Sequence, residues 1–345
     1  MDTIGLDLHK RESQLCIIGS QGEVTEKRIA TSRERFTAVL GKRARCRILL
    51  EASTESEWVA RHLESLGHEV IVADPGFAPM YATRSKKVKT DKRDARTLAE
   101  ACMLGAYRST HRVSAEQRHV RSELLVRDAL VRTRTRYVAL IKAAVRREGL
   151  RLSQGEAERT ASKVSAIELR EEVLQELRPI LGLLSPLNRE IDSADKRIEQ
   201  LGRNDPVVGR LMTAPGVGPV TALAFVAALD EVTRFPGAHQ VEAYLGLVPS
   251  EYSSGDRQHR GRITKRGNAR MRSLLVEAGW RILRSRKSEC SALRAWALQI
   301  AARRGKRIAV VALARRLSGI LFAMWRDGNN YRAPNVKVEG RTAAA

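Results

Sequence analysis

The first 75 residues alternate between short β-rich segments and amphipathic helical segments, and this order restricts the fold more than any other feature of the chain. Residues 3–8, 15–18 and 24–29 carry the apolar patterns of strands, with turn residues before the third. Helical and strand patterns then alternate from residue 36 to Ala73, where Asp74-Pro75-Gly76 ends the last strand. The pattern predicts a three-stranded meander followed by alternating helices and strands.

This βββαβαβα order is that of an RNase H-like α/β domain, and it predicts that acidic residues meet. Asp7 lies in the first strand and Glu51 ends the fourth, and these two strands are neighbours in that topology. Asp91 and Asp94 begin a predicted helix over residues 91–104, where a spacing of three places both carboxylates on one face. Acids in a first turn also complement the helix dipole without any function. Four converging acids are harder to explain as surface residues, and they suit divalent cations.

Basic residues surround the acidic pair on the helix. We predict that Lys89, Lys92 and Arg93 contact nucleic acid, because a basic collar around carboxylates suits a site that holds cations against a polyanion. The whole chain is basic, with 62 Lys and Arg against 39 Asp and Glu and a net charge of +23. Such a field attracts DNA, RNA or an anionic surface.

A membrane partner is not expected. No uninterrupted apolar run approaches the roughly 18 to 20 residues that a spanning helix needs, and the first residues do not form a signal peptide pattern. We therefore predict a cytoplasmic, nucleoid-associated protein of bacterial type. The four cysteines have no CxxC spacing, so they predict neither a zinc site nor a disulfide framework and are expected to be buried.

Two long helical segments occupy the middle of the chain. Residues 118–150 predict one helix rich in arginine, which either lies along a phosphate backbone or serves as a solubilising surface. Residues 166–201 carry apolar residues every three or four positions and predict a coiled-coil or hairpin spacer. Pro179 and Pro186 are expected to kink or break this second segment.

A glycine-rich turn follows the spacer. Pro215-Gly216-Val217-Gly218 stands between two predicted helices and resembles the hairpin of a helix-hairpin-helix motif, in which backbone amides approach a phosphate. We predict Gly216 and Gly218 as nucleic-acid contacts. The alternative is a tight turn that leads into an apolar core helix.

A serine pair precedes a strongly basic segment in the last third of the chain. A Ser-Ser-Gly loop is usually only a turn. Here Ser253 and Ser254 precede cations that could hold a phosphodiester and stabilise developing charge, which a serine nucleophile requires. Ser254 is favoured because it directly precedes Gly255, although the choice between the two serines stays open. The predicted nucleic-acid contacts in this segment are Arg257, Arg260, Arg262, Lys265 and Arg266.

These observations divide the chain into four predicted parts. Residues 1–115 form the RNase H-like domain with the four acids, and residues 116–203 form the basic helix and coiled-coil spacer. Residues 204–328 form a mainly α-helical domain that contains the serine and the helix-hairpin-helix-like element. Residues 329–345 are expected to be a disordered tail.

Read together, the acids and the serine segment resemble a known family. Asp7, Glu51, Asp91 and Asp94, followed by the segments 249–255 and 263–268, are similar to the DEDD transposases of the IS110 type. That family is related to the Piv DNA invertases and includes the bridge-RNA-guided recombinases. The resemblance covers about residues 1–327.

The resemblance implies a RuvC-like domain in which the four acids bind two Mg²⁺ ions, and a transposase domain whose serine forms a covalent phosphoserine with DNA. It also implies donor and target DNA, a structured bridge RNA, and a homodimer or homotetramer with shared active sites. We therefore predict an insertion-sequence transposase that cuts and rejoins DNA. The alternatives are a RuvC-like junction nuclease that does not use the serine, and an architectural nucleic-acid-binding protein that leaves the four acids unused.

Overall fold

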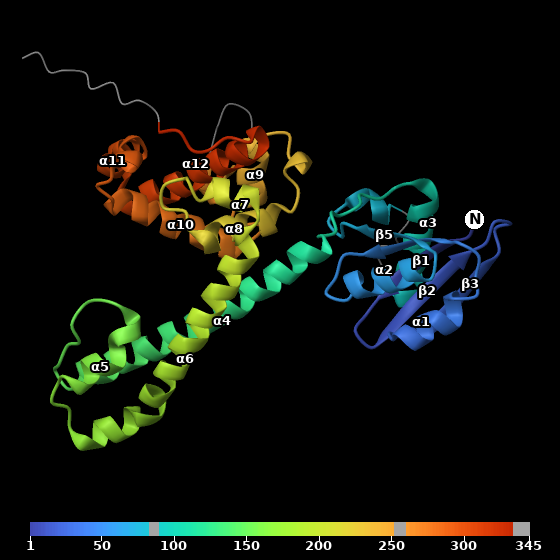
Figure 1. Cartoon of the computed structure of the whole chain (residues 1–345). Helices are drawn as coiled ribbons and strands as arrows, with labels where there is room; N and C mark the ends of the chain where they lie inside the picture. Colours follow the sequence, from blue (N-terminus) through green and yellow to red (C-terminus); the bar gives the residue numbers. More distant parts are fainter. Residues whose placement is uncertain (83–89, 252–259, 334–345) are drawn as a thin grey trace, which may run out of the picture. The chain divides into compact units, whose positions relative to one another are not determined.

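The computed structural model describes residues 1–82, 90–251 and 260–333 (Figure 1). The chain forms two compact units, Met1–Arg112 and Val113–Ala345, named here the N-terminal and C-terminal units. The predicted spacer and the predicted serine-bearing domain both fall within the C-terminal unit. All four cysteines are buried and free, as the sequence indicated.

The N-terminal unit contains a mixed five-stranded sheet in the order β3-β2-β1-β4-β5. β1 pairs antiparallel with β2 and parallel with β4, and the outer pairs are antiparallel β2–β3 and parallel β4–β5. This arrangement is compatible with the RNase H-like architecture that the sequence predicted. The strands are β1 (Thr3–Leu8), β2 (Glu12–Ile18), β3 (Val24–Ala30), β4 (Arg47–Glu51) and β5 (Glu69–Ala73).

Helices cover both faces of this sheet. Ile4 and Leu6 of β1 belong to the core under α1 (Arg33–Leu40) and α2 (Ser56–Ser65). The alternate residues of β1 point to the opposite face, where α3 (Asp91–Leu104) packs. The sheet is therefore built so that every second residue of β1 lies beneath α3.

Gly5 permits that close packing. A Cβ at this position would overlap the backbone of Ala95 and Ala99 in α3. Only glycine lets the helix approach the strand so closely, and this approach fixes where the first turn of α3 lies above β1. A short 3₁₀ helix, η1 (Ala78–Tyr81), also contacts α3.

Two long helices, α4 (Ala115–Arg147) and α6 (Glu171–Arg203), run side by side in the C-terminal unit (Figure 1). Pro179 and Pro186 both lie inside α6, which is one unbroken helix, so the expected break does not occur. Both prolines are exposed, so the carbonyl groups that lose a partner lie where water can bond them. The short elements η2 (Ala157–Arg159) and α5 (Thr160–Ser165) lie between the two long helices in sequence.

The rest of the C-terminal unit is a helical bundle around one core. Within it, α8 (Pro219–Leu229) is buried on all sides from residue 221 to residue 229. The strands β6 (Pro249–Glu251) and β7 (Arg260–Ile263) pair antiparallel and were not predicted. The remaining elements are α7 (Pro206–Leu211), η3 (Val232–Arg234), α9 (Ala238–Tyr244), α10 (Ala269–Arg284), η4 (Ser288–Cys290), α11 (Ser291–Arg304) and α12 (Lys306–Asp327).

Among the described residues, α12 is the one helix long and apolar enough to cross a membrane by length and composition. Half of its most apolar stretch is buried within the protein, and Leu313, Leu317 and Leu321 belong to the core of the C-terminal unit. After α12, Tyr331 is half-buried against the core of the C-terminal unit, whereas the other residues up to 333 are exposed. The backbone amide of Tyr331 donates to Thr213 Oγ1 at 2.9 Å, so this part of the tail predicted over residues 329–345 has a defined contact, and residues 334–345 lie outside the described residues.

Candidate functional site

The four predicted acids meet at one edge of the N-terminal sheet. Leu6 of β1 stands beside Leu50 of β4, so Asp7 and Glu51 are the next residues along two neighbouring parallel strands. Both acids alternate with core residues and so lie on the face that α3 covers. Asp91 and Asp94 occupy the first turn of α3, whose start is capped by Thr90. We name these four residues the acidic centre.

The electrostatics of Asp7 show how closely these carboxylates are grouped. Its side chain is 16% exposed. Burial raises the pKa of Asp7, and the negative charges of Asp94, Asp91 and Glu51 raise it further, while His9 lowers it. Each of the other three acids therefore lies near enough to act on Asp7. Four carboxylates are a set of hard oxygen ligands, so the residues fit a divalent cation such as Mg²⁺.

His9 belongs to the same cluster and was missed in the sequence. Its Nε2 lies 3.3 Å from Asp7 Oδ2 and 3.7 Å from Asp91 Oδ1. Ligand atoms of Asp7, His9 and Asp91 all lie within 4.8 Å of one another, which is a geometry that can hold a metal ion. The available signal was the spacing, because a residue two positions after Asp7 continues on the same side of an extended chain.

Tyr81 was also missed. Its hydroxyl donates a hydrogen bond to Glu51 Oε1 at 2.7 Å, from the last residue of η1. This bond orients the Glu51 carboxylate at the end of β4. The spacing of Tyr81 from the acids in the sequence does not predict this contact, since η1 returns the chain to the sheet through a turn.

The predicted basic collar is only partly described. Lys89 lies outside the described residues. Lys92 Nζ lies 3.7 Å from Glu26 Oε2 of β3, with 70% of the lysine side chain exposed. Arg93 is also exposed, in the first turn of α3. An exposed ion pair such as Lys92–Glu26 contributes little free energy, so a phosphate could replace the glutamate at small cost.

The two glycines of the predicted hairpin differ. Gly216 has φ +75°, and a Cβ there would lie 2.8 Å from the carbonyl oxygen of Ala278 in α10. Gly218 is the extended N-cap of α8, with φ −110° and open space where a Cβ would stand. Contacts within the protein therefore explain why residue 216 must be glycine, whereas Gly218 leaves the start of α8 accessible.

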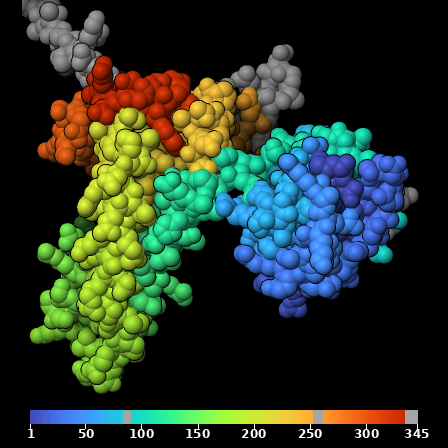
Figure 2. Space-filling model, turned by 45° about the vertical axis from the view of Figure 1, so that its right-hand side comes forward, coloured from blue at the N-terminus to red at the C-terminus, as the bar shows by residue number. Residues whose placement is uncertain are grey.

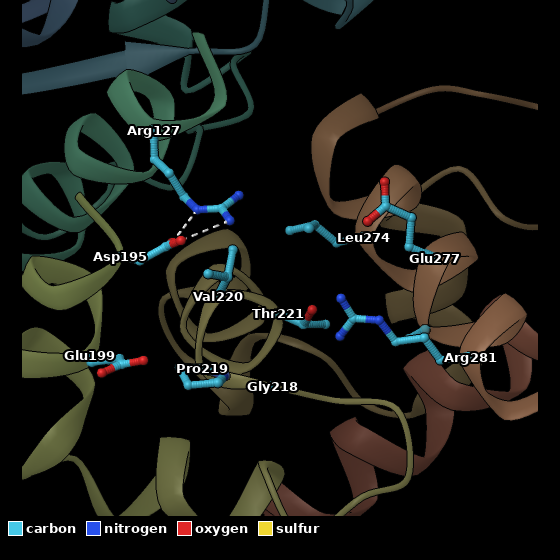
Figure 3. A pocket seen from close by; sticks show the side chains of 11 residues that line it. Arg127, Asp195, Glu199, Gly218, Pro219, Val220, Thr221, Leu274, Glu277 and Arg281 are labelled. Carbon is cyan, nitrogen blue, oxygen red and sulfur yellow. Dashed lines mark hydrogen bonds and ion pairs between the residues drawn. The ribbon is translucent and has the colours of Figure 1, made fainter. Parts of the chain in front are cut away.

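A cavity of about 250 Å³ opens at this start of α8 (Figure 3). Arg127 of α4 and Asp195 of α6 line it and are joined by two hydrogen bonds, one of them 3.3 Å from Nη2 to Oδ2. Glu199, Glu277 and Arg281 complete its charged lining. Three acids against two arginines do not favour a phosphate in this cavity, despite the helix start.

The serine segment connects two paired strands. Residues 252–259, which include Ser253, Ser254 and Arg257, lie outside the described residues, between the end of β6 and the start of β7. The Ser250 hydroxyl of β6 donates to the carbonyl oxygen of Arg262 in β7 at 3.0 Å. The base of the serine segment is therefore a hydrogen-bonded strand pair.

One arginine anchors the chain that follows β7. Nη1 of Arg272 donates to the carbonyl oxygens of Leu245, Arg266 and Gly267 at 2.9 to 3.1 Å. The predicted phosphate contacts Arg262, Lys265 and Arg266 are exposed. None of these three forms an ion pair within the part of the chain that the structure describes. The side chain of Arg260, the fourth predicted contact near β7, lies outside the described part.

Comparisons with known proteins identify the family of this chain. A family model for IS110-type DEDD proteins, described as "Transposase", matches residues 4–148. A second model, described as "Transposase IS116/IS110/IS902 family", matches residues 208–294. The first match contains the whole acidic centre and the second contains both serines.

Full-length relatives show the same similarity. The transposase for insertion sequence element IS1111A of Coxiella burnetii is 28% identical over 95% of this chain and 91% of its own length. The transposase for insertion sequence element IS1328 of Yersinia enterocolitica is 26% identical over 94% of this chain and 97% of its own length. A Sinorhizobium fredii relative, y4rJ, whose name also refers to a transposase, is 30% identical over 85% of this chain and 78% of its own length.

Proposed function

Because the chain belongs to the IS110-type DEDD transposases and is a DNA recombinase of an insertion sequence, we propose that it acts through a Mg²⁺-dependent covalent phosphoserine. The observation that carries the proposal is the acidic centre, in which Asp7 is brought together with Glu51, Asp91 and Asp94. Carboxylates whose like charges repel one another, placed where neighbouring strands end, are typical of a functional site.

The acids have the role of holding metal. Asp7, Glu51, Asp91 and Asp94 would bind two Mg²⁺ ions, with Tyr81 orienting Glu51 and His9 beside Asp7. Mg²⁺ bound there would neutralise charge on the scissile phosphate and stabilise the leaving oxygen. A purely architectural protein would gain nothing from this costly grouping of like charges.

The serine has the role of nucleophile. The Ser254 oxygen attacks phosphorus, the bond from phosphorus to the leaving DNA oxygen breaks, and that oxygen takes up a proton while the serine hydroxyl loses one. A DNA hydroxyl then attacks the phosphoserine, the bond from phosphorus to the serine oxygen breaks, and the serine regains its proton. Arg257, Arg260, Arg262, Lys265 and Arg266 would neutralise the phosphate during both steps.

A structured guide RNA and a homodimer or homotetramer complete the proposal, as the family resemblance implies. The net charge of +23 supports binding of a second polyanion besides DNA. Sequencing the nucleic acid that copurifies with the chain tests this part. One recurrent structured RNA supports a guide, and recombination that persists after complete RNase treatment contradicts it.

The covalent step is tested with labelled DNA. Wild type, Ser254→Ala and Ser253→Ala are incubated with DNA and Mg²⁺ and then denatured, and label that stays on the protein is measured. We expect label on wild type, none on Ser254→Ala and a partial amount on Ser253→Ala. Label on Ser254→Ala but not on Ser253→Ala would assign the nucleophile to Ser253. Free DNA ends without any label on wild type would replace the recombinase by a nuclease.

A further inference from the structure

The segment from the end of α10 to the start of α12 is dense in positive charge. Between Arg281 and Arg307 the chain contains nine lysines and arginines and one acid, Glu289. Seven of the nine lie in two turns and are exposed, three at residues 284–287 and four at residues 303–307. We name these seven side chains the α11 basic surface, because the two turns flank α11.

These cations lack acidic partners within the protein. Across the described ranges, no lysine or arginine of the α11 basic surface lies within ion-pair distance of a carboxylate. Elsewhere in the C-terminal unit, exposed arginines do find such partners. Arg170, for example, pairs with Glu148 at 2.7 Å. The absence of acids at the α11 basic surface leaves its positive field uncompensated.

The two turns belong to one packed group of helices. A Cβ at Gly279 would lie 3.0 Å from the carbonyl oxygen of Val310, so the end of α10 packs against the start of α12. Nε of Arg294 donates to the carbonyl oxygen of Leu283 at 3.2 Å, which joins the start of α11 to the last turn of α10. Figure 2 shows this region, coloured orange to red, at the surface.

Helix dipoles explain only some of these charges. Arg284 at the end of α10 and Arg303 and Arg304 at the end of α11 complement the negative ends of their helices. Lys306 and Arg307 instead begin α12, a helix of 22 residues with no acid in its first turn. Two cations at the positive end of a helix destabilise it, so an external anion explains them better than helix stability does.

We propose that the α11 basic surface binds the sugar-phosphate backbone of double-stranded DNA. The proposal rests on the family's DNA substrates but not on the acidic centre or the serine. Arg284 Cζ lies 5.2 Å from the ring centre of Trp280, and Arg316 Cζ lies 4.6 Å from that of Trp296. On each tryptophan, an arginine therefore covers one ring face on which a base could otherwise stack. A surface of cations with covered rings fits the regular phosphates of a duplex better than unstacked single strands.

The test measures binding of the full-length chain to duplex DNA of unrelated sequences, in EDTA so that no strand is cut. One variant replaces Arg303, Arg304, Lys306 and Arg307 by Gln. The matched control loses the same charge, by changing Arg61, Arg159, Arg170 and Arg178 to Gln. Each control arginine is paired with a glutamate at 2.6 to 3.5 Å.

We expect the first variant to bind every duplex at least about tenfold more weakly, with a salt dependence of log K that is shallower by about three to four. The control should stay within about twofold of wild type. If the fourfold variant does not fold, Lys306→Gln with Arg307→Gln should lower the slope by about two. Equal behaviour of variant and control would overturn the proposal.

Two further measurements distinguish this proposal from RNA binding and from the proposed catalytic mechanism. Duplex RNA of the same length is bound in parallel, and a loss confined to RNA would contradict DNA as the partner. Asp94→Asn should bind duplex DNA like wild type in EDTA. If the phosphoserine adduct is never found but the salt slope changes as expected, the covalent mechanism is wrong and the α11 basic surface stands.

Discussion

Carboxylates are grouped in both units, but their neighbours differ. In the N-terminal unit, Asp7 faces three other acids, and their charges add to burial in raising its pKa. In the C-terminal unit, Asp195 of α6 bonds Arg127 of α4. Asp128 of α4 lies 2.8 Å from Arg132 and 3.9 Å from Arg270 of α10.

The difference separates a functional group of charges from a structural one. Opposite charges between α4, α6 and α10 help to hold these helices together. Burial lowers the pKa of Arg270, and the negative charge of Asp128 opposes this effect by raising it, more strongly than Arg127 or Arg132 lowers it. Like charges around Asp7 oppose folding until a cation neutralises them. We therefore expect substitutions in the two groups to act on different properties.

The largest expected effect is on catalysis. Asp94→Asn removes one anionic ligand without adding bulk, so DNA strand cleavage in Mg²⁺ should fall by about a thousandfold. DNA binding in EDTA should be unchanged, because the metal is then absent. Cleavage by Asp94→Asn at a rate near that of wild type would show that the acidic centre is not the metal site.

Asp195→Asn is the matched change in the C-terminal unit. It leaves Arg127 without its carboxylate, and we expect a loss of about 1 to 2 kcal/mol in the free energy of unfolding, reduced from the value of a fully buried pair because Asp195 is 35% exposed. Strand cleavage by the folded variant should persist. A stable variant that no longer cleaves DNA would place the Arg127–Asp195 pair in catalysis.

The acidic centre should also depend on Gly5. Gly5→Ala places a methyl group in the backbone of α3, so we expect a loss of about 3 kcal/mol in stability and loss of cleavage. Gly182→Ala in α6 is the control, since a Cβ there meets nothing within 4 Å. It should stabilise the protein by about 0.5 to 1 kcal/mol. Urea unfolding curves measure the free energy of unfolding of both variants. Equal values for the two variants would contradict this prediction.

A smaller contrast is expected at the α7–α8 turn. Gly216→Ala must adopt a left-handed backbone and approach Ala278, so stability should fall by about 2 kcal/mol. Gly218→Ala keeps an extended backbone in open space and should cost less than about 1 kcal/mol as a weaker N-cap. Thermal unfolding compares the two. Weaker DNA binding by a stable Gly218→Ala variant would support the predicted phosphate contact at Gly218.

The smallest effect is that of metal on stability. Mg²⁺ at ten times its dissociation constant should raise the free energy of unfolding by about 1.4 kcal/mol, because it binds only the folded acidic centre. Asp7→Asn should lose most of this increase, whereas Asp195→Asn should keep it. The measurement is the unfolding midpoint with Mg²⁺ and with EDTA, and an equal response of both variants would place the metal elsewhere.

The sequence predicted the acidic centre because strand alternation is encoded locally and the order of the elements indicated which strands are neighbours. Asp7 and Glu51 follow apolar residues on known faces, and Asp91 and Asp94 share a helix face. Tyr81 could not be found in this way, since its contact with Glu51 depends on a 3₁₀ turn. β6 and β7 were missed because they are too short to show an alternation of apolar and polar residues. β6 has three residues, and β7 has four, one of which is Gly261.

The prolines of α6 show the limit of propensity. Pro179 and Pro186 each disfavour a helix, yet Leu177 and Leu184 on the opposite side pack in the core that the long helices share, and Ile191 on that side is also buried. Packing along the whole helix outweighs the local cost of two exposed prolines. Such packing is a property of the folded unit and could not be inferred from the segment alone.

The central claim is that the acidic centre binds divalent metal, and anomalous X-ray diffraction from crystals soaked in Mn²⁺ tests it most directly. Mn²⁺ takes the oxygen ligands that Mg²⁺ takes, and it can be located by its own scattering. We expect a peak about 2.1 Å from carboxylate oxygens of Asp7 and its neighbouring acids, and no such peak in Asp7→Asn. Well-ordered side chains of all four acids without a peak among them would contradict the account.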